Sequence, residues 1–263
     1  MGSDTIWQRW RQRLFSPGSA EPDAEATDCF WRVDIHSHLL PGVDDGVADW
    51  EQALTCLRQL ADWNVRKVIT TPHVSRDWYP NKTADLLRGQ RTLQALAREH
   101  NLPLIIEVAA EYMLDDFFPE LLDSGEVLTF GAPKYLLVET GWASAPFALE
   151  STLFRIQTHG YTPLLAHPER YSYYHDDEAG LARLREMGCL FQLNWMSLTG
   201  RYGRRVRRQA GRLLERGWAD FLGSDLHRPG DLTTMAEVFT TDEFRLLRKQ
   251  PLRNESLLTE QPG

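Results

Sequence analysis

Nine residues of the types that bind metal ions follow predicted β-strands along this chain of 263 residues. The first two, His36 and His38, come directly after an apolar run that predicts a strand over 31–35. Side chains two positions apart on an extended chain point to the same side, so both imidazoles can reach one ion. Taken alone, the pair is equally consistent with a polar loop after a buried strand. The full set is His36, His38, Asp45, His73, Glu111, Glu139, His167, Asp225 and His227.

This mixture of imidazoles and carboxylates suits zinc, manganese or iron better than magnesium or calcium. Nine ligands are too many for one ion and suit two or three ions that share bridging carboxylates. Sites with several metal ions activate a water molecule and hold both the attacking and the leaving oxygen of a phosphoryl transfer. A single His or Glu after a strand is more often a hydrogen-bonded loop residue, but nine in register favour a metal centre. His100, His159 and His175 do not follow strands and are left out.

The elements that must position these residues alternate between strand and helix, which is typical of a parallel sheet. Ligand-type residues follow six of the seven predicted strands. In a (β/α) barrel all strand ends meet at one mouth, whereas in an open sheet they spread along an edge, so we favour a barrel. The predicted strands are 31–35, 67–71, 104–109, 135–138, 162–166, 189–193 and 221–223, and the predicted helices are 47–63, 83–100, 117–122, 147–158, 181–187, 204–216 and 235–248.

The composition fits one soluble globular domain of barrel size. The net charge of −8 argues against a general nucleic-acid binder. Cys29, Cys56 and Cys189 form no C-x-x-C motif and no cysteine-nucleophile phosphatase loop, so we expect reduced thiols and a cytoplasmic location. No apolar run is long enough to span a bilayer. We predict a barrel over 31–263, preceded by an extension and linker over 1–30, in which residues 5–15 have helical apolar spacing that fits either peripheral contact or packing on the domain.

Six motifs surround the candidate ligands: Asp34-x-His36-x-His38-Leu-Leu-Pro-Gly-x-Asp44-Asp45-Gly46, Thr71-Pro72-His73, Ala110-Glu111-Tyr112, Leu137-Val138-Glu139, Ala166-His167-Pro168-Glu169-Arg170-Tyr171 and Gly223-Ser224-Asp225-Leu226-His227. Together they resemble the PHP superfamily. More closely, they resemble the metal-dependent protein-tyrosine phosphatases encoded with bacterial capsule and exopolysaccharide genes. The resemblance runs from about Val33 to the C-terminus.

The resemblance implies a distorted seven-stranded (β/α) barrel with three metal ions, usually manganese, although iron and zinc accept the same ligands. It assigns the first ion to His36, His38, Glu111 and Asp225. Glu111 then bridges to a second ion held by Glu139 and His167, and Asp45, His73 and His227 hold the third, with Asp44 as a competitor for Asp45. It also implies a phosphotyrosine protein substrate, the C-terminal tyrosine cluster of a polysaccharide-chain-length autokinase.

The same resemblance makes Arg170 the phosphate-binding residue and Arg228 the candidate for a second one, with Asp225 and His227 beside them in the catalytic set. An arginine fork suits two phosphate oxygens. The phenolate of tyrosine has a pKa near 10 and needs only modest acid assistance. The sequence leaves open whether Asp225 or a metal-bound water donates that proton.

Further side chains have two interpretations each. Arg201, Arg204, Arg205, Arg207, Arg208 and Arg212 form either a docking surface for an acidic or phosphorylated tail or a solvated helix face. Tyr171, Tyr173, Tyr174, Trp142 and Trp195 either wall the pocket or pack.

Two functions compete with the tyrosine phosphatase. One is a small-molecule phosphoesterase such as a histidinol phosphatase on the same barrel, and the other is a catalytically silent scaffold. The presence of all nine ligand positions argues against the silent scaffold.

Overall fold

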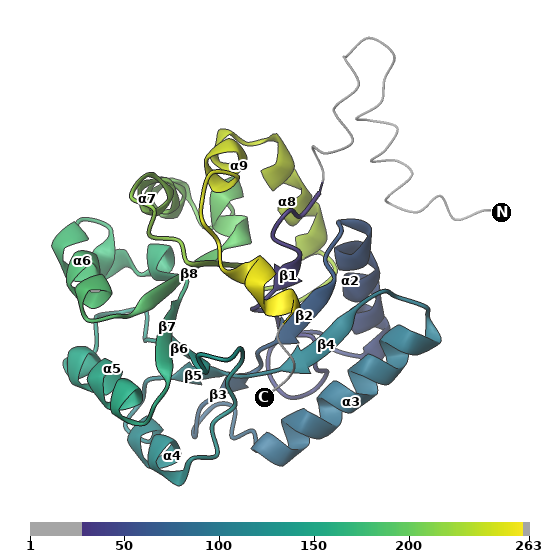
Figure 1. Cartoon of the computed structure of the whole chain (residues 1–263), viewed down its shortest axis with the longest axis horizontal. Helices are drawn as coiled ribbons and strands as arrows, with labels where there is room; N and C mark the ends of the chain where they lie inside the picture. Colours follow the sequence, from purple (N-terminus) through teal and green to yellow (C-terminus); the bar gives the residue numbers. More distant parts are fainter. Residues whose placement is uncertain (1–27, 260–263) are drawn as a thin grey trace.

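The computed structural model describes residues 28–259, so the predicted N-terminal helix and nearly all of the linker lie outside the described residues. The described part alternates strands and helices, and the helices surround a curled sheet (Figure 1). The strands are β1 (Val33–Asp34), β2 (Lys67–Thr70), β3 (His73–Val74), β4 (Ile105–Val108), β5 (Glu111–Met113), β6 (Tyr135–Glu139), β7 (Thr162–Ala166), β8 (Leu190–Asn194) and β9 (Phe221–Gly223). The helices are α2 (Trp50–Asp62), α3 (Thr83–Glu99), α4 (Phe118–Ser124), α5 (Leu149–Thr158), α6 (Glu178–Glu186), α7 (Arg204–Glu215), α8 (Asp231–Glu237) and α9 (Asp242–Leu247).

All strand pairs in the two sheets are parallel, in the orders β1-β2-β4 and β3-β5-β6-β7-β8-β9. The described residues thus hold nine strands rather than the predicted seven. The two extra strands, β3 and β5, follow the second and third predicted strands after short interruptions, and Pro72, which has no N–H to donate to a sheet, lies in the first of these interruptions. The register is the same on both sides of the interruptions, since Lys67 pairs with Ile105 and His73 with Glu111. The curled parallel α/β architecture agrees with the prediction, and the count of strands does not.

The first and last strands meet through side chains more than through sheet hydrogen bonds. One isolated parallel bridge joins Ser37 to Leu226. The buried Asp34 carboxylate accepts hydrogen bonds from the backbone N–H and the hydroxyl of Ser224, at 2.8 and 2.7 Å. The Asn254 amide donates to carbonyl oxygens of β1 and β9, at 2.8 and 2.7 Å. These contacts bring the ends of β1 and β9, and the motifs that follow them, side by side.

Two apolar clusters hold the strands in place. The larger one packs the helices onto the outside of the sheet. The smaller one joins residues from five strands, including Val33, Leu137 and Phe221, and such residues can touch one another only inside the curl. The core therefore fills the interior below the strand ends, as in a barrel.

The predicted helix over 235–248 is the one element that differs strongly. It is divided into α8 and α9, and the Thr241 hydroxyl between them accepts a hydrogen bond from Phe244 N at the start of α9. Threonine favours this capping position over a helix interior. His100 and His159 lie directly after α3 and α5, as predicted, and the three cysteines are buried thiols. Within residues 28–259 no helix has the length and apolar character needed to cross a bilayer.

Candidate metal centre

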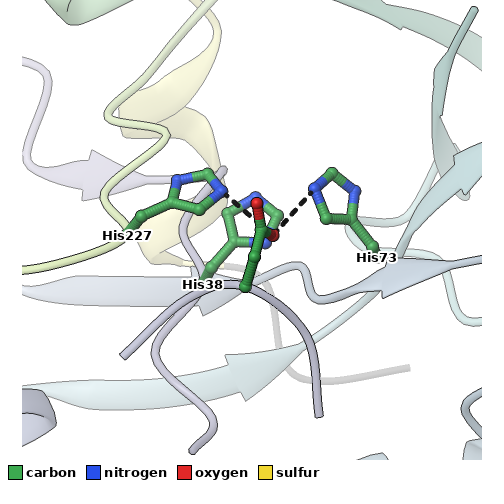
Figure 2. Close-up of side chains that lie close together, drawn as sticks. His38, His73 and His227 are labelled. Carbon is green, nitrogen blue, oxygen red and sulfur yellow. Dashed lines mark ion pairs between the residues drawn. The ribbon is translucent and has the colours of Figure 1, made fainter. Parts of the chain in front are cut away.

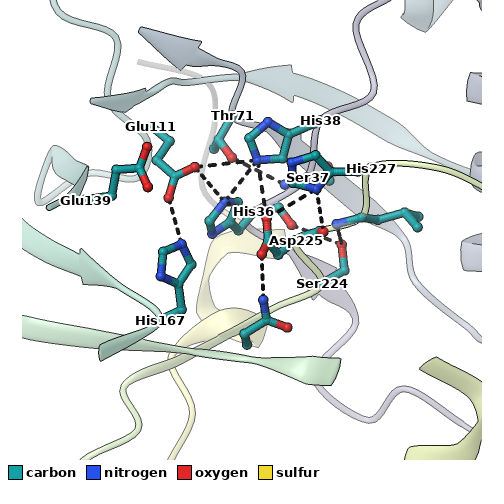
Figure 3. Close-up of polar contacts among 12 residues, drawn as sticks. His36, Ser37, His38, Thr71, Glu111, Glu139, His167, Ser224, Asp225 and His227 are labelled. Atoms are coloured by element: carbon teal, nitrogen blue, oxygen red, sulfur yellow. Dashed lines mark hydrogen bonds and ion pairs between the residues drawn. The ribbon is translucent and has the colours of Figure 1, made fainter. Parts of the chain in front are cut away.

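All nine candidate ligands lie at the same end of the curled sheet. Figure 3 labels all of them except Asp45 and His73. His36 and His38 follow β1, Asp45 lies in the loop beyond them, and His167 follows β7. Glu139 is the last residue of β6. The remaining four are His73 at the start of β3, Glu111 at the start of β5, and Asp225 and His227 after β9.

Their donor atoms form four overlapping groups in which the atoms lie within 4.8 Å of one another. Among the described residues, these groups contain all nine predicted positions and no others. Four side chains belong to two groups each, and Glu111 is the one carboxylate among them. The groups are His38, Asp45, His73 and His227; His36, Glu111 and His167; His36, His38 and Asp225; and His73, Glu111 and Glu139.

The grouping agrees only in part with the ligand sets implied by the resemblance. Asp45, His73 and His227 are together, with His38 added, and Figure 2 shows the three imidazoles turned toward one another. Glu139 is grouped with His73 and Glu111 rather than with His167. His167 instead contacts the other oxygen of Glu111, at 3.0 Å from Nε2 to Oε1.

The close approach of His36 to His38 is the strongest evidence for a cation-binding site. Their Nε2 atoms lie 3.2 Å apart. The Nδ1 atom of His36 faces Gln192 Oε1 at 2.8 Å, and the Nδ1 atom of His38 faces Asp44 Oδ2 at 2.8 Å. Because an Nδ1–H that donates to these oxygens leaves a lone pair on Nε2, two lone pairs point into the same space. A divalent ion between them fits this donor set.

Asp44 and Asp45 have different places although they are adjacent. The Asp44 carboxylate is buried, and it accepts hydrogen bonds from the backbone N–H groups of His73 and Gly46 in addition to its contact with His38. The Asp45 carboxylate is more exposed, with Oδ1 3.5 Å from His73 Nε2 and 3.6 Å from His227 Nε2. Asp45 is therefore the candidate ligand, and Asp44 orients one.

Asp225 connects the metal centre to the phosphate-binding candidate Arg170. Its Oδ1 lies 3.4 Å from both His36 Nε2 and His38 Nε2. Its Oδ2 accepts hydrogen bonds from Arg170 Nη1 at 2.7 Å and from Asn194 Nδ2 at 2.6 Å. Burial opposes its ionisation, but the charge of His36 and the hydrogen bond to His38 hold its pKa well below the usual range. Asp225 is thus an ionised acceptor.

Two of the candidate ligands have a backbone conformation that is rare outside glycine. His167 has φ 34° and Asp225 has φ 52°. Such left-handed backbone costs free energy in residues with a Cβ and collects at functional sites. Both residues stand where a strand ends and the chain turns, so this conformation aims their side chains into the centre.

Glu111 and His73 show the electrostatic balance of the ion-free site. Burial opposes the charge on Glu111, but His36, His73 and a hydrogen bond from His167 lower its pKa well below the usual value. Burial alone lowers the pKa of His73, but the Glu111 charge and hydrogen bonds to Glu111 and Glu139 raise it to about 10. Glu111 and His73 therefore favour each other's charged forms in this buried site.

A pocket of about 440 Å³ opens over the centre. Arg170 lines it, and its guanidinium carbon lies 4.6 Å from the ring centre of Trp142 and 4.3 Å from that of Tyr202. Trp142 is half-exposed at the pocket wall, while Trp195 is buried in the core. Among the other wall candidates, the buried Tyr171 packs against Trp142 with a tilted ring and meets His167 edge-on. Arg228 is not among the lining residues; its exposed side chain faces Asp231 with 3.7 Å between Nε and Oδ2.

Residues 32–238 match the family described as "Capsular polysaccharide synthesis, CpsB/CapC", which is most of the chain. The chain belongs to the CpsB/CapC family. It is 29% identical over 195 residues to the tyrosine-protein phosphatase YwqE of Bacillus subtilis, covering 74% of this chain and 77% of that protein. It is 28% identical over 202 residues to the tyrosine-protein phosphatase CpsB of Streptococcus pneumoniae, covering 74% of this chain and 82% of that one.

A solved structure of this family is similar in fold as well. It comes from work on YwqE of Bacillus subtilis and CpsB of Streptococcus pneumoniae, described as unique metal-dependent tyrosine phosphatases. The TM-score is 0.70 at 26% identity, and the match covers 84% of this chain and 96% of that one. This CpsB/CapC member therefore shares both the sequence motifs and the backbone arrangement of proteins named as metal-dependent phosphatases.

Two polar residues that contact the candidate ligands of this CpsB/CapC member were not predicted as site residues from the sequence. Gln192 accepts from His36 and from the backbone N–H of His167, and Asn194 donates to Asp225. Both are fully buried in β8. The signal that could have found them is a polar side chain within an otherwise apolar predicted strand, since buried polar groups need partners.

Proposed function

We propose that this chain is a metal-dependent protein-tyrosine phosphatase, a phosphoric monoester hydrolase of capsule or exopolysaccharide synthesis. The observation that carries the proposal is the contact between Asp225 and Arg170 at 2.7 Å, which joins nine converging ligand-type side chains to an arginine in the pocket above them. Membership in a family whose relatives are named tyrosine phosphatases supports the choice of substrate.

We further propose three divalent ions, manganese in the first place, in the four overlapping groups. Such ions, when bound, supply an activated water nucleophile at neutral pH and neutralise the phosphate charge. The side chains of this protein set the geometry: Gln192 and Asp44 fix the imidazole tautomers of His36 and His38. Glu111 faces four histidines and would be the carboxylate shared between two ions.

Arg170 binds the substrate phosphate in this proposal. One of its N–H groups is taken by Asp225, and the rings of Trp142 and Tyr202 hold the guanidinium plane. Within residues 28–259 its other N–H groups have no hydrogen-bond acceptor, so they are free for phosphate oxygens. Asp225 stays ionised and acts as a ligand rather than as the proton donor to the phenolate.

Turnover of a phosphotyrosine peptide, a phosphoserine peptide and histidinol phosphate with manganese tests this function. We expect chelator-sensitive hydrolysis of the phosphotyrosine peptide above the other two. Activity confined to histidinol phosphate contradicts the proposal in favour of a small-molecule phosphoesterase. No turnover with at least two bound ions per chain contradicts it in favour of a silent scaffold. We propose a tyrosine autokinase of polysaccharide synthesis as the protein substrate, which the same assay tests with the phosphorylated kinase.

A further inference from the structure

The helix that follows the Arg170 clamp carries an unusual concentration of arginines. Tyr202 covers one face of the Arg170 guanidinium, and α7 begins two residues later at Arg204. The helix α7 also packs against the turn Pro168–Arg170, so its beginning lies beside the Arg170 clamp. Arg204 and Arg208 are exposed and stand one turn apart on this helix.

A groove of about 520 Å³ runs between α7 and α9. Arg204, Arg208 and Arg212 line its α7 side at successive turns, together with Arg207 and, at the far end, Glu215. Asp242 and Glu243 line its α9 side. We call this groove, with these residues, the α7–α9 groove.

The charges of the α7–α9 groove are not balanced. Arg207 makes a two-pronged contact with Glu243, with both N–O distances 2.7 Å, and Asp242 is 3.1 Å from Arg245. Both acidic residues of α9 are thereby neutralised. Within residues 28–259, the side chains of Arg204 and Arg208 have neither an ion-pair partner nor a hydrogen-bond acceptor. The groove thus keeps free cationic groups.

The arginines of α7 disfavour the formation of this helix on its own. Like charges one turn apart repel each other, and cations in the first turn oppose the helix dipole. The first turn of α7 contains no acidic residue to offset them. Local violations of this kind are expected where a surface has a binding function.

We propose that the α7–α9 groove docks an acidic segment of the substrate polypeptide close to its phosphotyrosine. The inference rests on the proposed phosphatase function and adds the class of sequence that the enzyme prefers. Arginines bind carboxylates through paired N–H groups, so aspartate and glutamate side chains complement Arg204 and Arg208. A peptide segment can lie inside the groove and reach the arginines of its α7 side, whereas a flat membrane surface cannot enter a groove. We therefore commit to a peptide as the occupant.

The test compares two phosphotyrosine peptides that differ only in whether the flanking residues are aspartates or serines. The enzymes are the full chain, the double variant Arg204→Gln/Arg208→Gln and the control Arg91→Gln/Arg98→Gln. The control removes the same charge from α3, which lies on the other side of the molecule (Figure 1). Turnover of p-nitrophenyl phosphate measures activity without docking.

We expect the full chain and the control to prefer the acidic peptide by about tenfold in kcat/KM, through electrostatic steering that weakens with salt. The double variant should lose this preference while its turnover of p-nitrophenyl phosphate stays unchanged. An equal preference in the double variant, or none in the full chain, overturns the docking proposal.

A binding measurement keeps the two proposals separate. Fluorescence anisotropy with an acidic peptide that lacks tyrosine needs no turnover, so it decides docking even if no phosphotyrosine peptide is hydrolysed. The full chain should bind this peptide more tightly than the double variant does. If the double variant loses binding to phosphatidylglycerol vesicles while its peptide binding is unchanged, the groove binds a membrane surface and the peptide proposal is overturned.

Discussion

His38 Nδ1 lies 2.8 Å from the buried carboxylate of Asp44, whereas Asp45, the next residue, points into the group formed by His38, His73 and His227. Two adjacent aspartates thus have an orienting and a ligating role in the same centre. We expect Asp44→Asn to weaken metal binding by about 10- to 100-fold, as for other residues that orient ligands. The matched variant Asp45→Asn should instead remove one ion per chain. Metal analysis after dialysis against graded metal concentrations distinguishes the two; identical losses in both variants would contradict the division of roles.

Removal of the metal should reveal an unusual pH dependence. Burial lowers the pKa of His73, but the Glu111 charge and the hydrogen bonds to Glu111 and Glu139 raise it from its ordinary value of 6.5 to about 10. A raised pKa stabilises the folded state fully below 6.5, and that contribution is lost as pH rises toward about 10. The free energy of unfolding of the chelated protein should therefore fall across this range, as measured by denaturant titration. A His73→Gln variant should show a smaller fall, and constant stability in both proteins would contradict the assignment.

Gly223 has no room for a side chain. A Cβ there would lie 2.6 Å from the Cβ of His36 and 2.8 Å from Gln192 Nε2. We expect Gly223→Ala to lower the free energy of unfolding by about 1–3 kcal/mol through overpacking and to weaken metal binding by displacing His36. The control is Gly211→Ala within α7, where a Cβ meets nothing within 4 Å. It should raise stability by up to about 1 kcal/mol, since alanine favours helix over glycine. Thermal unfolding and metal titration give both readouts.

Arg170 should not be replaceable by lysine. Lysine keeps the positive charge but lacks the planar fork that contacts Asp225 and stacks between Trp142 and Tyr202. We expect Arg170→Lys to lower kcat/KM for p-nitrophenyl phosphate by about 100-fold, the usual loss when one donor to a transition-state oxygen is removed. Metal content should stay unchanged. The Arg228 side chain lies outside the pocket, so Arg228→Lys should leave activity close to that of the unchanged chain. A comparable loss of activity in Arg228→Lys would instead place Arg228 in the phosphate-binding site.

The stabilisation of the folded protein by manganese tests the metal centre as a whole. His38→Ala removes a residue that belongs to two of the four donor groups. We expect turnover to fall by at least about 100-fold and the stabilisation by manganese, about 2.7 kcal/mol at 100 times the dissociation constant, to disappear. Unfolding of the chelated variant should remain cooperative, because the apolar clusters are untouched. Surviving turnover would show that the ligand assignment is wrong.

Much of the fold was predictable because the pattern is local. The apolar alternation of strands and the amphipathic helices depend on neighbouring residues, so α3, β7 and β9 lie within one residue of their predicted ranges. The helix predicted over 235–248 failed because the capping of α9 by Thr241 outweighs helical periodicity. The strand count was wrong because short interruptions separate β3 and β5 from the second and third predicted strands, although the register continues across both.

By itself, the sequence determined which side chains can bind metal, since His and carboxylate residues after parallel strands must gather at one end of the sheet. Only the tertiary structure decided which atoms face one another. Asp44 and Asp45 are indistinguishable in a sequence, and their roles depend on how the loop after His38 folds against His73. Gln192, Asn194 and Tyr202 acquired roles through contacts with His36, Asp225 and Arg170, which are distant in sequence. Such contacts follow from the closure of β1 against β9 and the packing of α7, which no local pattern specifies.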